Sequence, residues 1–118
     1  MSSSQSQSPE AKLPLKPADF HILLVLSKQD LHGYGIMQEV EAESDGRVRL
    51  EVGSMYRLIA RLTDEGLITE SGRDSHERRR YYRITEFGKR VAKLEAQRLV
   101  DVVSVARRYN LLGDGDRS

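Results

Sequence analysis

The sequence contains no cysteine, which excludes a disulfide framework and a zinc site built from thiolates. Its apolar runs fall far short of the roughly 18 residues that a membrane-spanning helix needs, so no membrane segment is expected. The N-terminus begins with Met1 and three serines and has neither a basic start nor an apolar signal core. Together, these absences predict a protein that works in the cytoplasm.

The chain also has little of the apolar material that a large enzyme requires. Of its 118 residues, 38% are hydrophobic and 31% are charged, which suits one compact domain with a short appendage. His21, His32 and His76 are too scattered for a metal site, and no serine, histidine and carboxylate group together as in a hydrolase. Gly33-x-Gly35 lacks the third glycine and the preceding strand of a dinucleotide loop. We therefore expect no catalytic residue, metal or cofactor.

Apolar periodicity predicts three helices in the first half of the chain. Residues 1–12 are polar and rich in serine, and are expected to form a disordered tail. A buried first helix starts at Pro17, and a short second helix runs from Ile36 to about Ser44. A third helix is expected over residues 54–65, because four apolar residues form a single stripe at helical spacing: Met55, Leu58, Ile59 and Leu62.

A β-hairpin is predicted after the third helix. Residues 67–71 and 79–84 are rich in Ile, Thr and Tyr, and the seven residues between them contain no apolar side chain. Tyr82 and Ile84 share one side of the second strand and are expected to face the core. Thr85 then stands where it can cap a further helix.

This last helix, expected from Phe87 to Asn110, would be about 36 Å long, which is too long to pack wholly on one small domain. Its apolar residues cover roughly 200° of its surface, about twice what one packing partner needs, so a second subunit is the obvious other partner. Glu95 and Arg98 fall within this arc and should pair with each other or across the interface, or remain hydrated at its edge. The expected interface residues of this helix are Val91, Leu94, Leu99, Val102, Val103, Ala106 and Tyr109.

The order of these elements predicts a mainly α protein with a small β-hairpin wing (α+β), namely a winged helix-turn-helix followed by a long C-terminal dimerisation helix. Residues 13–85 would form the DNA-binding domain, 86–112 the dimerisation helix and 113–118 a frayed tail. Residues 30–45 carry five carboxylates and no Lys or Arg, whereas 73–90 carry seven Lys or Arg and three carboxylates. A chain with a net charge of only +1 thus has a polarised surface, which is typical of a DNA-binding face.

Three motifs occur in a recognisable order: His32-Gly33-Tyr34-Gly35, the run from Gly53-Ser54-Met55-Tyr56-Arg57 to Glu65-Gly66-Leu67-Ile68, and Arg80-Tyr81-Tyr82-Arg83-Ile84-Thr85 with Gly88. With them, the chain resembles the PadR-like transcriptional regulators from Leu15 to about Leu112. The resemblance implies a dimeric repressor whose last helix forms the dimer with help from the first helix, where Leu23 lies, and it implies that many members respond to a small aromatic or drug-like ligand. The chain departs from the family pattern at Val52, where proline is frequent, and at the wing tip Ser75-His76-Glu77, which lacks the usual small or proline residue.

Four candidate DNA contacts lie on the third predicted helix. Arg57 and Arg61 fall opposite its apolar stripe, where they are either ordinary solvated charges or contacts to phosphates and base edges. The resemblance places a DNA contact at Tyr56, although a tyrosine there can equally pack half-buried. Ser54 either caps the helix or holds a phosphate with its hydroxyl or backbone amide.

Further candidates lie on the second helix and the wing. Tyr34 opens a helix that crosses the DNA backbone in this arrangement, and its hydroxyl either binds a phosphate or packs in the core. Arg78, Arg79 and Arg80 stand where they could neutralise phosphates, although such a run is often only a soluble turn. His32 is expected to be a helix-start residue with a satisfied ring rather than a ligand.

We therefore expect a homodimeric transcription factor, a repressor that binds double-stranded DNA at a pseudo-palindromic operator. The alternative is a winged helix that serves as a protein-interaction module without DNA binding, because fold alone does not determine function. Acidic or apolar residues in place of Arg57 and Arg61 would have favoured that alternative. A ligand-sensing cavity between the first and last helices is compatible with the main interpretation.

Overall fold

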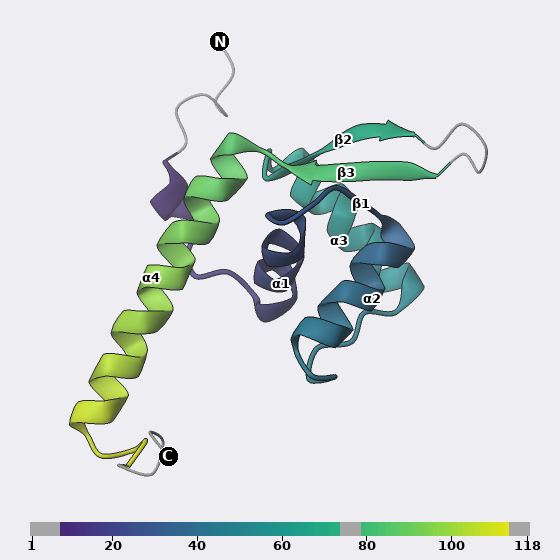
Figure 1. Ribbon diagram of the computed structural model, residues 1–118. Helices are drawn as coiled ribbons and strands as arrows, with labels where there is room; N and C mark the ends of the chain where they lie inside the picture. Colours follow the sequence, from purple (N-terminus) through teal and green to yellow (C-terminus); the bar gives the residue numbers. More distant parts are fainter. Residues whose placement is uncertain (1–7, 74–78, 114–118) are drawn as a thin grey trace.

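Three helices and a small sheet form the body of the molecule, and a long fourth helix runs along one side and beyond it (Figure 1). The computed structural model describes residues 8–73 and 79–113. Within these ranges the elements, in chain order, are η2 (Pro9–Lys12), α1 (Pro17–Leu26), β1 (Leu31–His32), α2 (Gly33–Glu43), α3 (Val52–Asp64), β2 (Ile68–Arg73), β3 (Arg80–Ile84) and α4 (Glu86–Arg108). The winged helix-turn-helix predicted from the sequence is confirmed.

The first helix is central because nearly every side of it is apolar. Its proline at the first helical position suits the start of a helix, and side chains on several of its sides are fully buried: Ile22, Leu23, Val25 and Leu26. The predicted apolar stripe of α3 faces this core, with Met55, Ile59 and Leu62 buried and Leu58 half-buried. Burying such a side chain contributes about 2 kcal/mol to folding, so this stripe fixes which side of α3 stays outside.

Two helices begin earlier than their apolar patterns indicate. The apolar repeat of α2 starts only at Ile36, but the His32 side chain caps the helix by accepting a hydrogen bond from the Gly35 amide at 3.0 Å, and the helix begins at Gly33. This confirms His32 as a helix-start residue. The third helix begins at Val52, two residues before the predicted Ser54, because polar or exposed residues in a first turn leave no apolar signal.

The sheet contains the predicted hairpin and one strand that the sequence did not reveal. Strands β2 and β3 pair antiparallel with a register shift between Glu70 and Gly72, and β1 adds on the other side of β3. Two residues are too few to show alternation, so β1 could not be predicted. Residues 48–51, which connect α2 to α3, form a loop, and hydrogen bonds between the Ser44 hydroxyl and the Val48 backbone hold its start.

The inner side of β3 closes the core as predicted. Tyr82 and Ile84 are 8% and 6% exposed, which confirms that they face inward. Thr85 caps α4 by accepting a hydrogen bond from the Gly88 amide at 2.9 Å, which confirms the predicted cap. A Cβ atom at Gly88 would overlap the Leu67 carbonyl, so glycine is required where α4 leaves the sheet. The predicted wing tip at Ser75-His76-Glu77 lies outside the described residues.

Helix α4 packs on the domain only along its first half. Val91 and Glu95 are buried there, whereas the side chains from Leu99 onward are mostly exposed. Of the three alternatives left open for Glu95 and Arg98, the structure shows the pairing with each other, with Arg98 Nε 2.8 Å from Glu95 Oε1 and Nη2 2.7 Å from Oε2. Among the described residues, no helix combines the length and the hydropathy that crossing a membrane requires.

Two of the expected dimer contacts are already buried within the protomer. Leu23 and Val91 each have no exposed surface and belong to the core of the protomer itself. Leu94 and Ala106 are half-buried, whereas four of the expected residues are exposed by 37% or more: Leu99, Val102, Val103 and Tyr109. The apolar pattern of α4 serves two purposes, because its N-terminal part covers the core and only its C-terminal part is left for a partner.

The N-terminal segment is more ordered than predicted. Residues 9–12, expected to belong to a disordered tail, form the short helix η2, which packs beside α4 (Figure 1). The Leu15 amide donates a hydrogen bond to Glu95 Oε1 at 3.3 Å, which holds the following residues on α4. Composition indicates the entropy of a free segment, but it does not show a surface elsewhere in the chain that the segment can bind. Residues 1–7 lie outside the described part.

Candidate nucleic-acid interface

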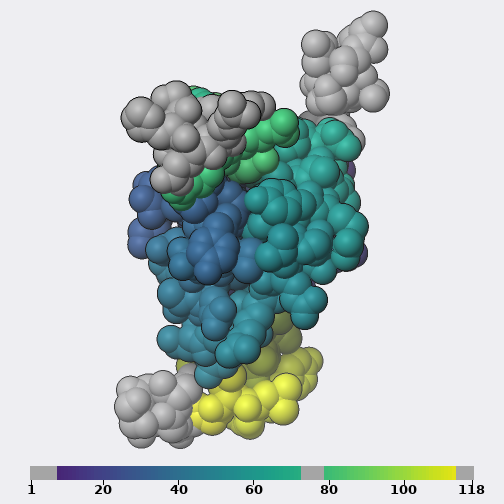
Figure 2. Space-filling model, turned by 90° about the vertical axis from the view of Figure 1, so that its right-hand side faces the viewer, coloured from purple at the N-terminus to yellow at the C-terminus, as the bar shows by residue number. Residues whose placement is uncertain are grey.

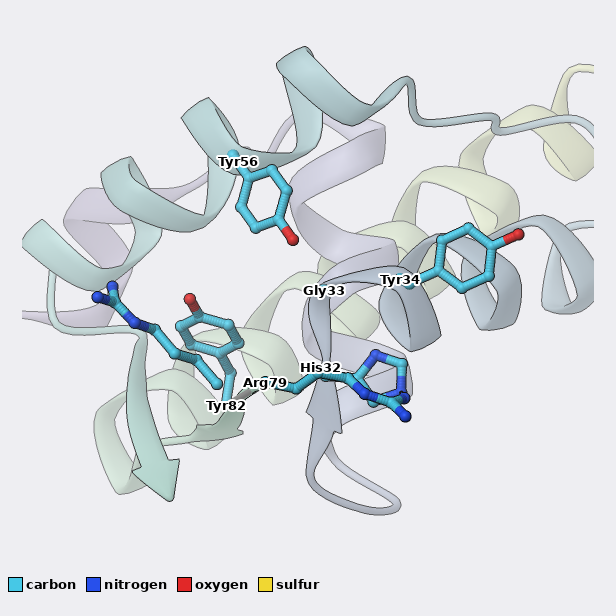
Figure 3. A pocket seen from close by; sticks show the side chains of 7 residues that line it. His32, Gly33, Tyr34, Tyr56, Arg79 and Tyr82 are labelled. Atoms are coloured by element: carbon cyan, nitrogen blue, oxygen red, sulfur yellow. The ribbon is translucent and has the colours of Figure 1, made fainter. Parts of the chain in front are cut away.

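An open pocket of about 480 Å³ lies where the starts of α2 and α3 meet the outer end of the wing (Figure 3). Figure 2 shows this face, with α2 in blue beside α3 in teal and the green of the wing above them. The pocket has three phenol rings and two guanidinium groups in its lining: His32, Gly33, Tyr34, Tyr56, Arg79, Arg80 and Tyr82. Four residues predicted as DNA contacts, far apart in the sequence, are thus brought to one place.

The three tyrosines come from three different elements. Tyr34 on α2 and Tyr56 on α3 are 58% and 51% exposed, whereas Tyr82 on β3 is almost buried. In Figure 3 the hydroxyl groups of Tyr56 and Tyr82 point into the space between the elements. Burial raises the pKa of the Tyr82 phenol, so its O–H stays protonated and able to donate at neutral pH.

Gly33 allows α3 to approach the start of α2. A Cβ atom at this position would lie 2.9 Å from the Tyr56 hydroxyl oxygen and 3.1 Å from Met55 Cε, closer than ordinary van der Waals contact. The absence of a side chain therefore lets the Tyr56 ring lie against the backbone of α2, facing the pocket. Tyr56 is neither free nor buried, because one side of the ring packs on Gly33 while half of its surface stays accessible.

His32 connects α2 to the wing. Its Nδ1 accepts the capping hydrogen bond from the Gly35 amide at the start of α2, and its Nε2 lies 2.8 Å from Arg79 Nη1. The imidazole ring also meets the Tyr81 ring edge-on at a centroid distance of 5.3 Å. The start of α2 and the first residues of β3 are thus held together, and Arg79 and Arg80 are set beside the pocket.

The exposed side of α3 adds to this surface. Arg57 is exposed, and its Nη2 donates a hydrogen bond to the Ser54 hydroxyl at 3.2 Å. Within residues 8–73 and 79–113, Arg57 forms no ion pair with a carboxylate, so its charge is not neutralised by the described part of the protein. Ser54 is half-buried one turn before it, and Glu51 rather than Ser54 occupies the N-cap position, where it makes no capping hydrogen bond.

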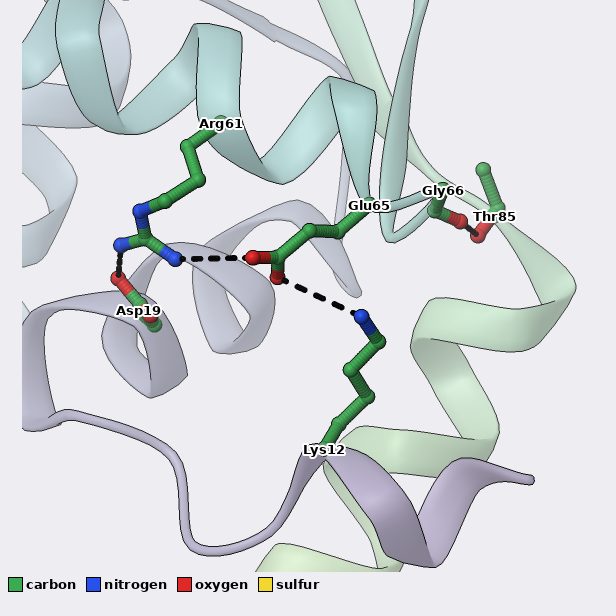
Figure 4. A network of polar contacts seen from close by, with 6 residues as sticks. All are labelled: Lys12, Asp19, Arg61, Glu65, Gly66 and Thr85. Atoms are coloured by element: carbon green, nitrogen blue, oxygen red, sulfur yellow. Dashed lines mark hydrogen bonds and ion pairs between the residues drawn. The ribbon is translucent and has the colours of Figure 1, made fainter. Parts of the chain in front are cut away.

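Arg61 lies elsewhere, although the helical pattern puts it on the same face as Arg57. Its Nη2 is 2.8 Å from Asp19 Oδ1 on α1, and its Nη1 is 3.5 Å from Glu65 Oε2 (Figure 4). The hydrogen bond that Arg61 donates to the Asp19 carboxylate is the main cause that raises the pKa of the Arg61 guanidinium. Arg78, the remaining predicted contact, lies outside the described residues.

Sequence reasoning missed the part that Gly33, His32 and Tyr82 play in this pocket. Alternation along β3 correctly placed the Tyr82 ring in the core, but it did not indicate that Tyr82 also lines the pocket with its hydroxyl group. A buried tyrosine needs a polar outlet for its hydroxyl, and that requirement was the available signal. In the part of the chain that the structure describes, no group of His, Asp or Glu side chains is arranged to hold a metal ion.

Comparison with known proteins shows the family to which the chain belongs. A model of the transcriptional regulator PadR-like family matches residues 22–96, which is more than half of the chain. The chain belongs to this family. PadR-like proteins are transcriptional regulators that bind DNA, and not enzymes. The match runs from the middle of α1 to the middle of α4 and includes the whole pocket and the exposed side of α3.

Solved structures of PadR-like regulators share the fold. A PadR family transcription regulator from Clostridium difficile is 27% identical, with a TM-score of 0.68 over 80% of this chain and 98% of that chain. A PadR-like transcriptional regulator from Bacillus cereus is 27% identical, with a TM-score of 0.67 over 80% and 90%. A transcriptional regulator from Clostridium thermocellum is 27% identical, with a TM-score of 0.67 over 77% of this chain and 90% of that chain. A search of the curated proteins finds no significant match.

Proposed function

We propose that this PadR-like regulator binds double-stranded DNA through the pocket and the exposed side of α3. In a winged helix, the third helix enters the major groove and the wing touches the backbone. The single observation that carries the proposal is the convergence of Tyr34, Tyr56, Arg79 and Arg80 on one open pocket beside α3. Their phenol and guanidinium groups present hydrogen-bond donors, which suit the oxygens of a phosphate backbone that only accept.

Each DNA-contact residue then has a separate task. Arg57, exposed on α3 and without a carboxylate partner in the described part, reads base edges or phosphates in the groove. Tyr34, Tyr56 and Arg80 hold the phosphates that pass over the pocket, with Arg79 adding positive charge. Arg78, which lies outside the described residues, stays a predicted contact. Ser54 supports Arg57 through its hydroxyl. We leave Arg61 out of the contacts because two carboxylates of the same protomer hold its guanidinium.

We further propose that the regulator is a homodimer formed by α4. The face that buries Val91 and Glu95 continues along the helix, but the side chains of its C-terminal part are mostly left exposed by the described residues. This part, here called the α4 apolar stripe, consists of Leu99, Val102, Val103, Ala106 and Tyr109. Such a dimer would present its two α3 helices to successive major grooves about 34 Å apart, which requires a pseudo-palindromic operator.

Repression and release complete the proposal. A dimer seated on its operator excludes other proteins from the same DNA, so the simplest regulatory outcome is repression. The family resemblance suggests release by a small aromatic ligand, and α1 and α4, which pack against each other, are the helices expected to line its site. A winged helix that binds only protein is the alternative, but the exposed side of α3 carries Arg57, whose charge has no carboxylate partner in the described part of the chain and suits a polyanion better.

The experiment is a titration of the protein with duplex DNA taken from immediately upstream of its own gene, followed by fluorescence anisotropy. Binding driven by phosphate contacts releases counterions, so we expect the affinity to fall about a thousandfold between about 50 and 200 mM salt. A scrambled duplex of equal length and composition is the control for specificity. An affinity that does not change with salt, or equal affinity for both duplexes, would contradict the proposal.

A further inference from the structure

We propose that Arg61 is a positioning residue, which fixes the orientation of α3 through Asp19 and does not itself touch DNA. This inference rests on the proposed DNA binding and assigns a role to a residue that its helical position alone marks as a DNA contact. The side chain of Arg61 points toward Asp19 on α1, as Figure 4 shows, and Arg61 is not among the residues that line the pocket. The two neighbouring cations, Arg57 and Arg80, have no such carboxylate partners in the described part of the chain.

The geometry of the pair is that of a built contact rather than a chance surface pair. The Arg61 Nη2 to Asp19 Oδ1 distance is 2.8 Å, and the Asp19 residue is only 4% exposed. Asp19 lies in the first turn of α1, where the helix dipole favours a negative charge. The other arm of the guanidinium reaches Glu65, at the C-cap of α3, at 3.5 Å. The planar guanidinium of Arg61 therefore connects the start of α1, at Asp19, with the C-terminal end of α3, at Glu65.

Because Asp19 is buried, Arg61 pairs more favourably with the Asp19 carboxylate than with a DNA phosphate. Within the described residues, Arg61 is the sole ion-pair partner of Asp19. If the guanidinium swung out to a phosphate, it would leave a buried carboxylate without compensation, whereas a phosphate on the DNA surface is already solvated. The exchange is unfavourable, so the Asp19 contact persists when DNA is bound.

The contact also links α3 to the proposed dimerisation helix. Glu65 lies 4.0 Å from Lys12 Nζ on η2, and η2 packs beside α4. The N-terminal segment is then held on α4 by the Leu15 amide and Glu95. The Asp19, Arg61, Glu65 and Lys12 contacts therefore connect α3 to the N-terminal segment, whose backbone leads to the Leu15 contact on α4. In a dimer, this connection helps to set how two α3 helices meet their half-sites.

The test compares variants of Arg61 with a matched variant of Arg57. Binding to the upstream duplex is measured over a salt series, and melting temperatures are recorded in parallel. We expect Arg57→Gln to lower the slope of log affinity against log salt by about one, as the loss of a phosphate contact does. We expect Arg61→Gln to weaken binding about tenfold with the wild-type slope, because no phosphate contact is lost.

Two further substitutions distinguish a positioning role of Arg61 from a direct DNA contact. Asp19→Asn removes a negative charge and frees Arg61, so it would strengthen binding if Arg61 were a DNA contact. We expect it to weaken binding about tenfold, like Arg61→Gln, and the double variant to be no worse than either, as for two residues that act through one contact. Arg61→Lys keeps the charge but not the fork, and we expect it to restore little of the binding.

The double variant Asp19→Leu with Arg61→Met keeps the experiment decisive if single variants do not fold. It replaces the ion pair by apolar side chains and leaves no buried charge, an exchange that proteins often tolerate. Its salt slope should equal that of the wild type. A slope lowered by about one in either Arg61 variant, or stronger binding by Asp19→Asn, would overturn the inference. Absence of salt-dependent binding by the wild type would overturn the proposed function as well, so the two failures are distinguishable.

Discussion

The Tyr56 hydroxyl on α3 occupies the space that a side chain at Gly33 on α2 would need, 2.9 Å from the position of its Cβ atom. The two residues stand 23 positions apart, yet they determine together how closely the two helices that face the DNA can approach. On one side of this contact lies the buried Met55, and on the other lies the pocket with Tyr34 and Arg80. The contact therefore links the packing of the domain to the surface proposed to hold phosphates.

Replacing Gly33 by alanine should displace Tyr56 and weaken DNA binding. The new methyl group would meet both the Tyr56 ring and Met55, and such overpacking costs about 1–3 kcal/mol. We expect about tenfold lower affinity for the upstream duplex, since about 1.4 kcal/mol corresponds to a factor of ten. Gly35→Ala, on the same helix, is the matched control, because a Cβ there would lie 3.4 Å from Leu31 Cδ2 and 3.5 Å from the His32 ring, which are ordinary van der Waals contacts. Unchanged affinity in Gly33→Ala would show that Tyr56 does not contribute to binding.

Arg80→Ala should weaken DNA binding without affecting the fold. The residue is exposed at the mouth of the pocket and lies outside the core. We expect the slope of log affinity against log salt to fall by about one, with the melting temperature unchanged. Lys93→Ala, an exposed cation on α4, should leave both the affinity and the slope as they are. An equal effect of both substitutions would mean that only the net charge matters.

A charge in the α4 apolar stripe should separate the proposed dimer. Val103 is 42% exposed in the protomer and lies near the middle of the stripe. In a dimer, Val103→Glu would bury a carboxylate without a partner, which costs several kcal/mol. Light scattering should then report a monomer, and binding to the upstream duplex should weaken. Gln97→Ala, on the opposite face beside Asp101, should remain dimeric. A dimeric Val103→Glu variant would place the interface elsewhere.

The buried carboxylate of Glu95 should make stability depend on pH in the acid range. Hydrogen bonds from Arg98 lower the pKa of Glu95 below its ordinary value of 4.5 in the folded protein. The carboxylate therefore stabilises the fold above that value, and this contribution is lost as the pH falls through the lower folded-state pKa.

Glu95→Gln should test this pH dependence by urea unfolding at several pH values. Near neutral pH we expect the variant to be about 2 kcal/mol less stable, the scale of hydrogen bonds to a charged group. The difference should shrink as the pH is lowered below 4.5. Glu86→Gln serves as the control, since its pair with Lys89 is exposed and should matter little at any pH. A difference that stays constant down to strong acid would show that the charge of Glu95 does not contribute.

The sequence by itself determined the elements whose signals are local. The stripe from Met55 to Leu62 predicted both the helix and its buried side, and Thr85 predicted the start of α4. The alternation along β3 placed Tyr82 and Ile84 inward. Spacings of two, three and four residues reflect the geometry of a strand or a helix turn, so neighbours in the chain suffice to predict them. The family motifs follow the same logic, since they combine these spacings with turn residues.

Only the tertiary structure decided which of several equivalent side chains meet a partner. Arg57 and Arg61 stand on the same helix face by spacing, yet a buried carboxylate 42 positions away holds Arg61 within the domain. Leu23 and Val91 are as apolar as Leu99, but they are covered by the core, whereas Leu99 lies beyond it. Residues 9–12 form η2 because α4 offers them a surface. Such contacts join residues that are distant in the chain, and their free energy depends on what the rest of the fold brings close, which no local pattern contains.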